Sequence, residues 1–341
     1  MKRITYLDVA RGAAILLVVL GHSIQYAGPG FDDNLAYNFI YAVHMPLFMF
    51  LAGFTAALPA NRPRGSIGAR ARQLLVTFLV WIPISYVAIR YIQRPEEGCP
   101  DFGHFLLQIL RNPDAGGLWF LLVLFECHLL LLGITKLGAS LKATIVLGAV
   151  ALLVMNITVI VAPDLNWLGL GLLRWYFLFF IAGLVAARIG WTPPTARTSA
   201  AVCLAYLVLA AFWSRKGAVP VDLWLPHWQG ARRQLAVQAY HALAAAVGIV
   251  GLMGVFSALA NNAPRYLRKL ESALTALGAR SLQIYAGHYI FLYVAITLTA
   301  SWQRDSAARI LALFVVALVG SLALARCVDS LPRMRTLLYG R

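Results

Sequence analysis

The residues best suited to chemistry lie near the N-terminus, where Arg11 and His22 bracket an apolar stretch that follows Asp8. In an α-helix, an eleven-residue step comes within about 20° of three full turns, so Arg11 and His22 share one face about 16 Å apart along the axis. Ionisable side chains inside an apolar helix usually face a bundle interior or a watery cavity. The pattern therefore predicts one wall of a polar site.

Two simpler interpretations of this stretch remain open. Arg11 serves equally well as an anchor that reaches the cytoplasmic headgroups with Asp8 as its partner, and His22 then lies at the opposite interface. A signal peptide is the other alternative, because Lys2 and Arg3 precede a short apolar run. The charges at Asp8 and Arg11 and the lack of a small-residue cleavage site argue against it.

Two further stretches place polar groups on one helix face by steps of four and three residues. These sets are Tyr37, Tyr41 and His44, and Ser281, Tyr285 and His288. Pro46 lacks an amide hydrogen, which predicts a kink near His44. An aromatic stripe is more often packing than a ligand platform, but a histidine several residues deep in a span needs a polar partner.

Two charged residues lie alone in other apolar stretches, Glu126 and Arg174. Glu126 is expected about two turns inside a membrane span, where it is protonated, paired with an arginine as pure structure, or catalytic. Arg174 is either the partner of Glu126 or a donor to an anionic group. The residues alone leave these alternatives open.

The composition excludes a water-soluble globule. The chain has 341 residues, of which 61% are hydrophobic and 12% charged, and its mean hydropathy is +0.74. The formal charge of +16 comes from residues in short loops between apolar runs rather than from one basic face, so nucleic acid is not an expected partner. The four cysteines show no paired metal spacing, and no metal site is expected.

Windows of about twenty apolar residues predict an all-α polytopic membrane protein with about ten transmembrane helices. The predicted spans are 9–26, 36–58, 73–93, 117–135, 143–162, 167–187, 199–213, 235–257, 276–299 and 307–327. About eighteen basic residues fall on the N-terminal side against nine on the other, which predicts that both termini are cytoplasmic. The segment 94–117, rich in proline and glycine, is expected to be an outer loop.

Four stretches together resemble a known family. They are Tyr6-Leu-Asp8 with Arg11-Gly12 and then His22 after ten intervening residues, His44-Met-Pro46-Leu-Phe48, Trp119-Phe-Leu121, and Gly278-x-x-Ser281-Leu-x-Ile-Tyr285-x-x-His288. They are similar to the motifs of the acyltransferase-3 family, within it to the fucose 4-O-acetylase-like branch of sugar O-acetyltransferases. The resemblance covers the whole chain as about ten spans, so a single domain is expected over 1–341 without an appended soluble domain.

The resemblance implies an integral enzyme of the plasma membrane, expected to be the bacterial inner membrane. Such an enzyme moves an acyl group, commonly acetyl from acetyl-CoA, to a hydroxyl of a saccharide or related acceptor, as in the O-acetylation of polysaccharides. The acyl-CoA is then a co-substrate, and no tightly bound cofactor is expected. The arginine-ten-histidine motif of the family falls on Arg11 and His22.

Making an ester from a thioester needs a base for the hydroxyl proton and donors for the developing oxyanion. His22 is the predicted base, and Arg11 is a candidate for the phosphates of CoA because a guanidinium matches phosphate geometry. Arg11, His44 and Glu126 are further catalytic candidates. The predicted substrate-binding residues are Tyr37, Tyr41, Arg174, Ser281, Tyr285 and His288.

The competing class is a transporter or flippase for a saccharide or small metabolite, in which the buried His, Glu and Arg side chains relay protons or bind cargo. Inverted repeats or paired broken helices would favour that class, and none is visible beyond the kink at Pro46. A structural scaffold does not account for three histidines within spans.

Overall fold

The computed structural model describes residues 4–58, 67–93, 98, 100–113, 117–162 and 167–340. Within these ranges almost every element is a helix. The exception is a short antiparallel pair formed by β1 (Trp213–Ser214) and β2 (Gly217–Ala218), in which Trp213 lies opposite Ala218. The predicted all-α class is confirmed.

In the described part of the chain, nine helical segments are long and apolar enough to cross a membrane. They are Thr5–Ala27, Leu35–Ala57, Ile67–Gln93, Trp119–Leu137, Leu141–Thr158, Trp167–Arg188, Gly230–Asn262, Ser281–Leu298 and Ala307–Asp329. The predicted span 199–213 corresponds to helix α10 (Ala196–Ala211), whose 16 residues rise about 24 Å, less than a hydrocarbon core of about 30 Å. The polytopic membrane class is confirmed.

The helices gather into two compact units. Unit 1 comprises Met1–Phe48, Thr192–Ser281 and Ser301–Phe314, and unit 2 comprises Met49–Trp191, Leu282–Ala300 and Val315–Arg341. Each unit draws on segments far apart in the sequence. Whether they act as the single domain expected over 1–341 stays a prediction.

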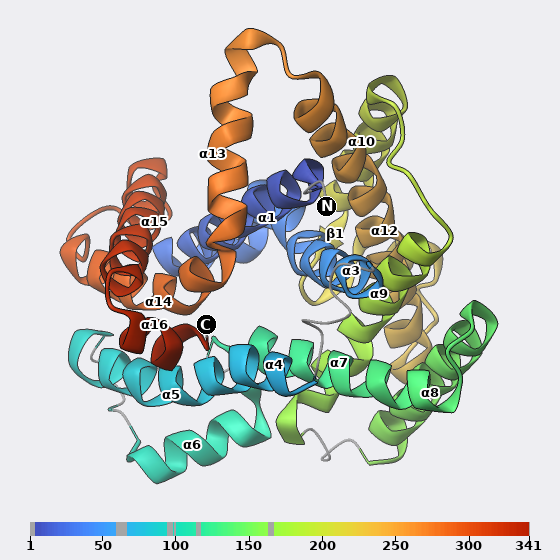
Figure 1. Cartoon of the computed structure of the whole chain (residues 1–341), viewed down its shortest axis with the longest axis horizontal. Coiled ribbons are helices and arrows are strands. Elements are labelled where there is room, and N and C mark those ends of the chain that lie inside the picture. The colour runs from blue at the N-terminus through green and yellow to red at the C-terminus, as the bar shows by residue number, and fades with distance from the viewer. Residues whose placement is uncertain are drawn as a thin grey trace. The chain divides into compact units, whose positions relative to one another are not determined.

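Unit 1 holds most of the N-terminal helices together with the segment before the ninth predicted span. Its elements are α1 (Thr5–Ala27), η1 (Pro29–Asp33), α2 (Leu35–Tyr41), α10, β1, β2, α11 (Val219–Trp224), α12 (Gly230–Asn262), η7 (Arg265–Leu267) and α13 (Arg268–Ala279). Helix α1 packs against α13 and α12, and α10 packs along α12 (Figure 1). Thirteen buried residues of α1 make it the centre of this unit.

Unit 2 is built on the helices between the third and sixth predicted spans. Its elements are α4 (Ile67–Ala71), the π-helical turns η3 (Arg72–Val76) and η4 (Ile89–Gln93), α5 (Thr77–Ala88), α6 (Phe102–Arg111), α7 (Trp119–Leu137), α8 (Leu141–Val161), η6 (Trp167–Gly169), α9 (Leu170–Arg188) and α16 (Pro332–Tyr339). Three helices, α3 (His44–Ala57), α14 (Ser281–Leu298) and α15 (Ala307–Asp329), contain residues of both units. Helix α7 packs against α8 and α9, and α16 lies on α5 (Figure 1).

Two glycines let the backbones of α1 and α13 touch in unit 1. A Cβ atom on Gly12 would lie 1.9 Å from the carbonyl oxygen of Leu274, and one on Gly278 would lie 2.0 Å from that of Asp8. No real Cβ fits so close to a carbonyl, so only glycine permits this packing. The glycines that follow Arg11 and precede Ser281 in the motifs therefore fix where α1 lies.

The kink predicted at Pro46 is present as a break between two helices. Helix α2 ends at Tyr41 and α3 begins at His44, with Ala42 and Val43 in a turn between them. Proline lacks the amide hydrogen that would bond the carbonyl four residues earlier, and its ring crowds that carbonyl. The break therefore lies one turn before Pro46 and brings His44 to the start of a helix.

The loop expected over 94–117 contains a short helix, α6 (Phe102–Arg111), while 94–97, 99 and 114–116 lie outside the described residues. The Asp101 side chain accepts hydrogen bonds from the amides of Gly103 and His104, as an N-cap residue does. These bonds, the backbone bond from His104 first, hold the pKa of Asp101 below its ordinary value. Phe105 and Ile109, one turn apart, are the buried face of the helix.

Candidate active site

His22 lies at the centre of a hydrogen-bonded triangle in unit 1. Its Nδ1 is 3.0 Å from Gln25 Oε1 and 3.1 Å from the Tyr41 hydroxyl oxygen. The Tyr41 hydroxyl in turn donates to Gln25 Oε1 at 2.8 Å. An amide oxygen can only accept, so this arrangement places the ring proton of His22 on Nδ1 and leaves the lone pair on Nε2.

The second predicted face, formed by Tyr37, Tyr41 and His44, is a continuous stack of rings. The Tyr37 and Tyr41 rings are stacked with centroids 3.9 Å apart, and the Tyr41 and His44 rings are 4.7 Å apart. His44 is 3% exposed, and its Nδ1 donates to the carbonyl of Ile40 at 2.8 Å. Tyr41 therefore joins the histidine of α1 to the histidine of α3.

Arg11 lies one turn from Asp8 on α1 and is ion-paired with it. Arg11 Nη1 is 3.3 Å from Asp8 Oδ1, and their side chains are 31% and 10% exposed. The close α1–α13 contact at Gly12 holds this turn of the helix. The structure thus gives Arg11 the partner that the anchor interpretation expected, while keeping it on the same helix as His22.

Arg174 bonds a different partner from the one considered in the sequence. Its Nη1 donates to Asn156 Oδ1 at 2.9 Å, which links α9 to α8. Among the described residues Glu126 and Arg174 form no ion pair, and Glu126 Oε2 is buried without a hydrogen-bond partner there. The interpretation of Arg174 as the partner of Glu126 is therefore wrong: an amide one helix away takes its guanidinium.

The predicted residues of α14 fall in different settings. The Tyr285 hydroxyl donates to the carbonyl of Gly117 at 3.0 Å and lies 3.3 Å from the amide nitrogen of Phe120, at the beginning of α7. His288 is fully buried, with Nδ1 2.7 Å from the carbonyl oxygen of Tyr285. Ser281 is the first residue of α14 and belongs to unit 1. Tyr285 thus links α14 to the beginning of α7.

The candidates therefore divide between the units. Arg11, His22, Tyr37, Tyr41, His44 and Ser281 belong to unit 1, and Glu126, Arg174, Tyr285 and His288 belong to unit 2. Direct contacts join the cluster of His22, Tyr41, Tyr37 and His44. That cluster is the candidate active site.

Sequence reasoning missed two residues of unit 1. Gln25 lies three residues after His22, the same spacing by which Tyr41 and His44 were found, so the pattern held the signal. Arg309, in the first turn of α15, is 6% exposed, and its Nε and Nη1 have no hydrogen-bond partner among the described residues. Arg309 gave no comparable signal in the sequence, because an arginine near the end of a span is expected to be a loop charge that sets the topology.

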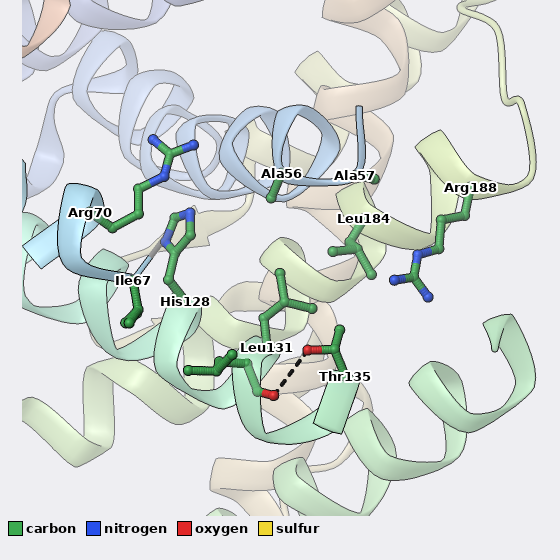
Figure 2. A pocket seen from close by; sticks show the side chains of 10 residues that line it. Ala56, Ala57, Ile67, Arg70, His128, Leu131, Thr135, Leu184 and Arg188 are labelled. Atoms are coloured by element: carbon green, nitrogen blue, oxygen red, sulfur yellow. Dashed lines mark hydrogen bonds between the residues drawn. The ribbon is translucent and has the colours of Figure 1, made fainter. Parts of the chain in front are cut away.

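A cavity of about 300 Å³ in unit 2 was not expected from the sequence. Its lining residues are Ala56, Ala57, Ile67, Arg70, His128, Leu131, Leu132, Thr135, Leu184 and Arg188. Figure 2 shows Arg70 beside the His128 ring at one side of the cavity and Arg188 at the other. Two arginines and a histidine from separate helices thus line one cavity.

Comparison with known proteins identifies the class. The helices define a polytopic membrane protein, and unit 1 contains two histidines and two tyrosines whose rings are in contact. A family model described as an acyltransferase domain, Acyl_transf_3, matches residues 4–326. Because that match spans most of the chain, this protein belongs to the acyltransferase-3 family.

Two curated relatives carry the name Nodulation protein NolL. The chain is 26% identical to that of Mesorhizobium japonicum over 250 residues, which covers 70% of this chain and 64% of the relative. It is 30% identical to that of Sinorhizobium fredii over 195 residues, which covers 53% of this chain and 48% of the relative. The chain thus spans less than two thirds of these relatives' own length. No solved structure matches it significantly.

Proposed function

We propose that this protein is an O-acetyltransferase that moves an acetyl group from acetyl-CoA to a hydroxyl of a saccharide or related acceptor, with His22 as the general base. The observation that carries the proposal is the His22–Gln25–Tyr41 triangle. It holds the imidazole proton on Nδ1, so Nε2 is ready to take the proton of an acceptor hydroxyl. Family membership supports the acyl-transfer chemistry.

The surrounding rings suit a sugar acceptor. Aromatic side chains such as Tyr37 and Tyr41 give an apolar face with a polar edge, which matches the alternating faces and hydroxyls of a pyranose. His44 is fixed by its bond to Ile40, so it serves as a positioned donor or acceptor beside the ring stack. Arg11 then supplies positive charge along α1 for the donor's phosphates, balanced in part by Asp8.

Both termini are proposed to be cytoplasmic, in a bacterial inner membrane. With this orientation Arg11 lies near the cytoplasmic face, where acetyl-CoA is available, and His22 lies about 16 Å deeper along α1. A pantetheine arm or a relayed acyl group then connects the two. The N-terminal helix thus provides a path from donor to acceptor.

The test is acetyl transfer from radiolabelled acetyl-CoA by purified protein in vesicles, with a panel of saccharide acceptors. The His22→Gln variant keeps an amide in place of the imidazole and should lose about 100-fold or more of the transfer rate, the usual contribution of a general base. His227→Gln is the matched control, because His227 is exposed in an outer loop. Full activity in His22→Gln would refute the base assignment.

The competing function has its own readout in the same vesicles. A transporter would move labelled saccharide across the membrane without any label leaving CoA. Saccharide uptake with no acetylated product, for every acceptor in the panel, would replace the proposal.

A further inference from the structure

The cavity of about 300 Å³ in unit 2 is lined by residues of four helices. Ala56 and Ala57 come from the end of α3, Arg70 from α4, His128 from α7 and Arg188 from the end of α9 (Figure 2). The volume lies at the lower limit of ligand pockets in proteins, about 300–1,000 Å³. The cavity is therefore large enough for part of a ligand.

A close helix contact builds one wall of this cavity. A Cβ atom on Gly53 would lie 1.8 Å from the carbonyl oxygen of Phe180, and one on Gly183 would lie 2.0 Å from that of Phe50. The backbones of α3 and α9 therefore touch one turn before Ala57 and directly before Leu184, two residues that line the space. The wall is rigid and preformed, which lowers the cost of ordering a bound ligand.

The lining is cationic. Arg70 and Arg188 contribute two guanidinium groups, and none of the lining residues within the described ranges is an aspartate or glutamate. Arg188 Nη1 donates to Thr144 Oγ1 at 2.6 Å and to the carbonyl of Ala139 at 3.3 Å, so these bonds leave Nε and Nη2 unused. His128 Nδ1 donates to the carbonyl of Leu124 at 2.8 Å, so this ring offers an acceptor at Nε2 and adds no donor for an anion.

We propose that this cavity binds a phosphorylated ligand through Arg70 and Arg188. A guanidinium presents planar pairs of N–H donors that match phosphate oxygens, and charge-assisted bonds of this kind are about twice as strong as neutral ones. Thr135 Oγ1 is already committed to the carbonyl of Leu132, so recognition rests on the cationic groups.

Two sources can supply the phosphate, the nucleotide portion of the acyl donor or the headgroup of an anionic phospholipid. The nucleotide source rests on the proposed function. It fits the expected orientation, because α3, α7 and α9 all end on the side where the basic loops predict the cytoplasm. The cavity then adds a binding place for the donor in unit 2, besides Arg11 in unit 1.

The first arm measures binding of adenosine 3′,5′-bisphosphate by calorimetry to the full-length protein in phosphatidylcholine nanodiscs. Arg70→Gln and Arg188→Gln should each raise the Kd about tenfold. Ala57→Leu should do the same by filling the cavity without changing charge. Arg188→Lys keeps the positive charge, so it distinguishes loss of ligand charge pairing from loss of the bonds that Arg188 makes to Thr144 and Ala139. Arg197→Gln is the control at an exposed arginine.

The second arm measures retention of phosphatidylglycerol by native mass spectrometry on the same variants. Loss of phosphatidylglycerol in the cavity variants, with no bisphosphate binding by any protein, supports the phosphate site and identifies the lipid as its source. The proposal is overturned if the cavity variants match Arg197→Gln in both arms, or if Arg11→Gln alone weakens bisphosphate binding.

The result is separable from the proposed function. His22→Gln should bind the bisphosphate as the parent protein does, even though it transfers no acetyl group. Loss of transfer with intact bisphosphate binding tests the base, whereas loss of binding in Ala57→Leu tests the cavity.

Discussion

The Tyr41 hydroxyl oxygen lies 3.1 Å from His22 Nδ1, and the two rings meet edge to face with centroids 6.1 Å apart. This contact joins α2 to α1 across nineteen residues of sequence. Gln25 closes the triangle from the next turn of α1. Gln25 and Tyr41 together therefore fix the orientation of the imidazole ring.

Replacing Gln25 with leucine should slow acetyl transfer about 3- to 10-fold, the effect of losing one hydrogen bond that holds the imidazole. Gln25→Glu should instead move the rise of kcat to higher pH, because a carboxylate stabilises the protonated imidazole of His22, which cannot act as a base. The pH dependence of kcat measures both.

The control for this pair is Gln234→Leu, since Gln234 is exposed on α12. A purely structural role for Gln25 predicts lower protein yield with an unchanged pH profile. An unmoved profile in Gln25→Glu would therefore remove Gln25 from the positioning of His22.

The glycines of the α1–α13 contact should tolerate no side chain. Gly12→Ala and Gly278→Ala each place a methyl group about 2 Å from a carbonyl oxygen, so the helices must separate. We expect a loss of about 2–4 kcal/mol of stability, within the range for overpacking and lost contacts in a core. Thermal unfolding in detergent followed by circular dichroism measures it.

Gly133→Ala in α7 is the matched control, because a Cβ there meets no atom within 4 Å. Alanine favours a helix over glycine by roughly 0.5–1 kcal/mol, so this variant should be unchanged or more stable. Equal stability of all three alanine variants would contradict the close contact.

The bond from Arg174 to Asn156 should appear as a coupling energy between α9 and α8. A double-mutant cycle of Arg174→Ala and Asn156→Ala should give about 0.6–1.7 kcal/mol, as found for polar pairs inside membranes. The parallel cycle of Arg174→Ala with Glu126→Ala should give a value near zero. A larger coupling energy for Arg174 with Glu126 than with Asn156 would instead support an ion pair between Arg174 and Glu126.

Tyr339→Phe should leave stability unchanged or raise it slightly. The ring of Tyr339 stacks on Trp81 with centroids 6.2 Å apart, and its hydroxyl is buried without a partner among the described residues. Phenylalanine keeps the stack and removes a polar group that gains nothing from burial. Tyr339→Ala should lose the stack and loosen α16 from α5.

Alkaline pH provides a second test at this position. Burial, and next the Asp329 carboxylate, raise the pKa of Tyr339 to about 12 from the ordinary 10.0. The folded protein holds this proton more tightly than the unfolded chain, so stability falls as pH rises from 10 to about 12. Difference absorbance of the parent against Tyr339→Phe should place this titration near 12; a midpoint near 10 would contradict it.

The sequence predicted the spans well because twenty-residue apolar windows reflect a physical need, the width of the bilayer. The same periodicity predicted the stack of Tyr37, Tyr41 and His44, since neighbours on one helix face need no knowledge of the rest of the fold. Pro46 likewise predicted a break, because the cause lies within one turn of the chain.

The contacts between distant helices could not be predicted in this way. Arg174 bonds Asn156 rather than Glu126 because the partner depends on which helices are neighbours in the bundle. Which helices are neighbours cannot be read from a single sequence. The cavity at Arg70 and Arg188 was missed for the same reason. Each arginine alone is consistent with a loop anchor, and only the cavity that both of them line distinguishes a site.

Helix α12 has 33 residues and is therefore about 50 Å long, against a hydrocarbon core of about 30 Å. Tilts of transmembrane helices reach about 40°, which cannot absorb that excess, so part of α12 stands in water. Arg232 and Arg233 identify the N-terminal part as that portion. Here Val237 meets Ala218 and Val221 in a small apolar cluster. This cluster is held by the exclusion of water rather than by contact with lipid, so urea should dissolve it while the spans stay folded.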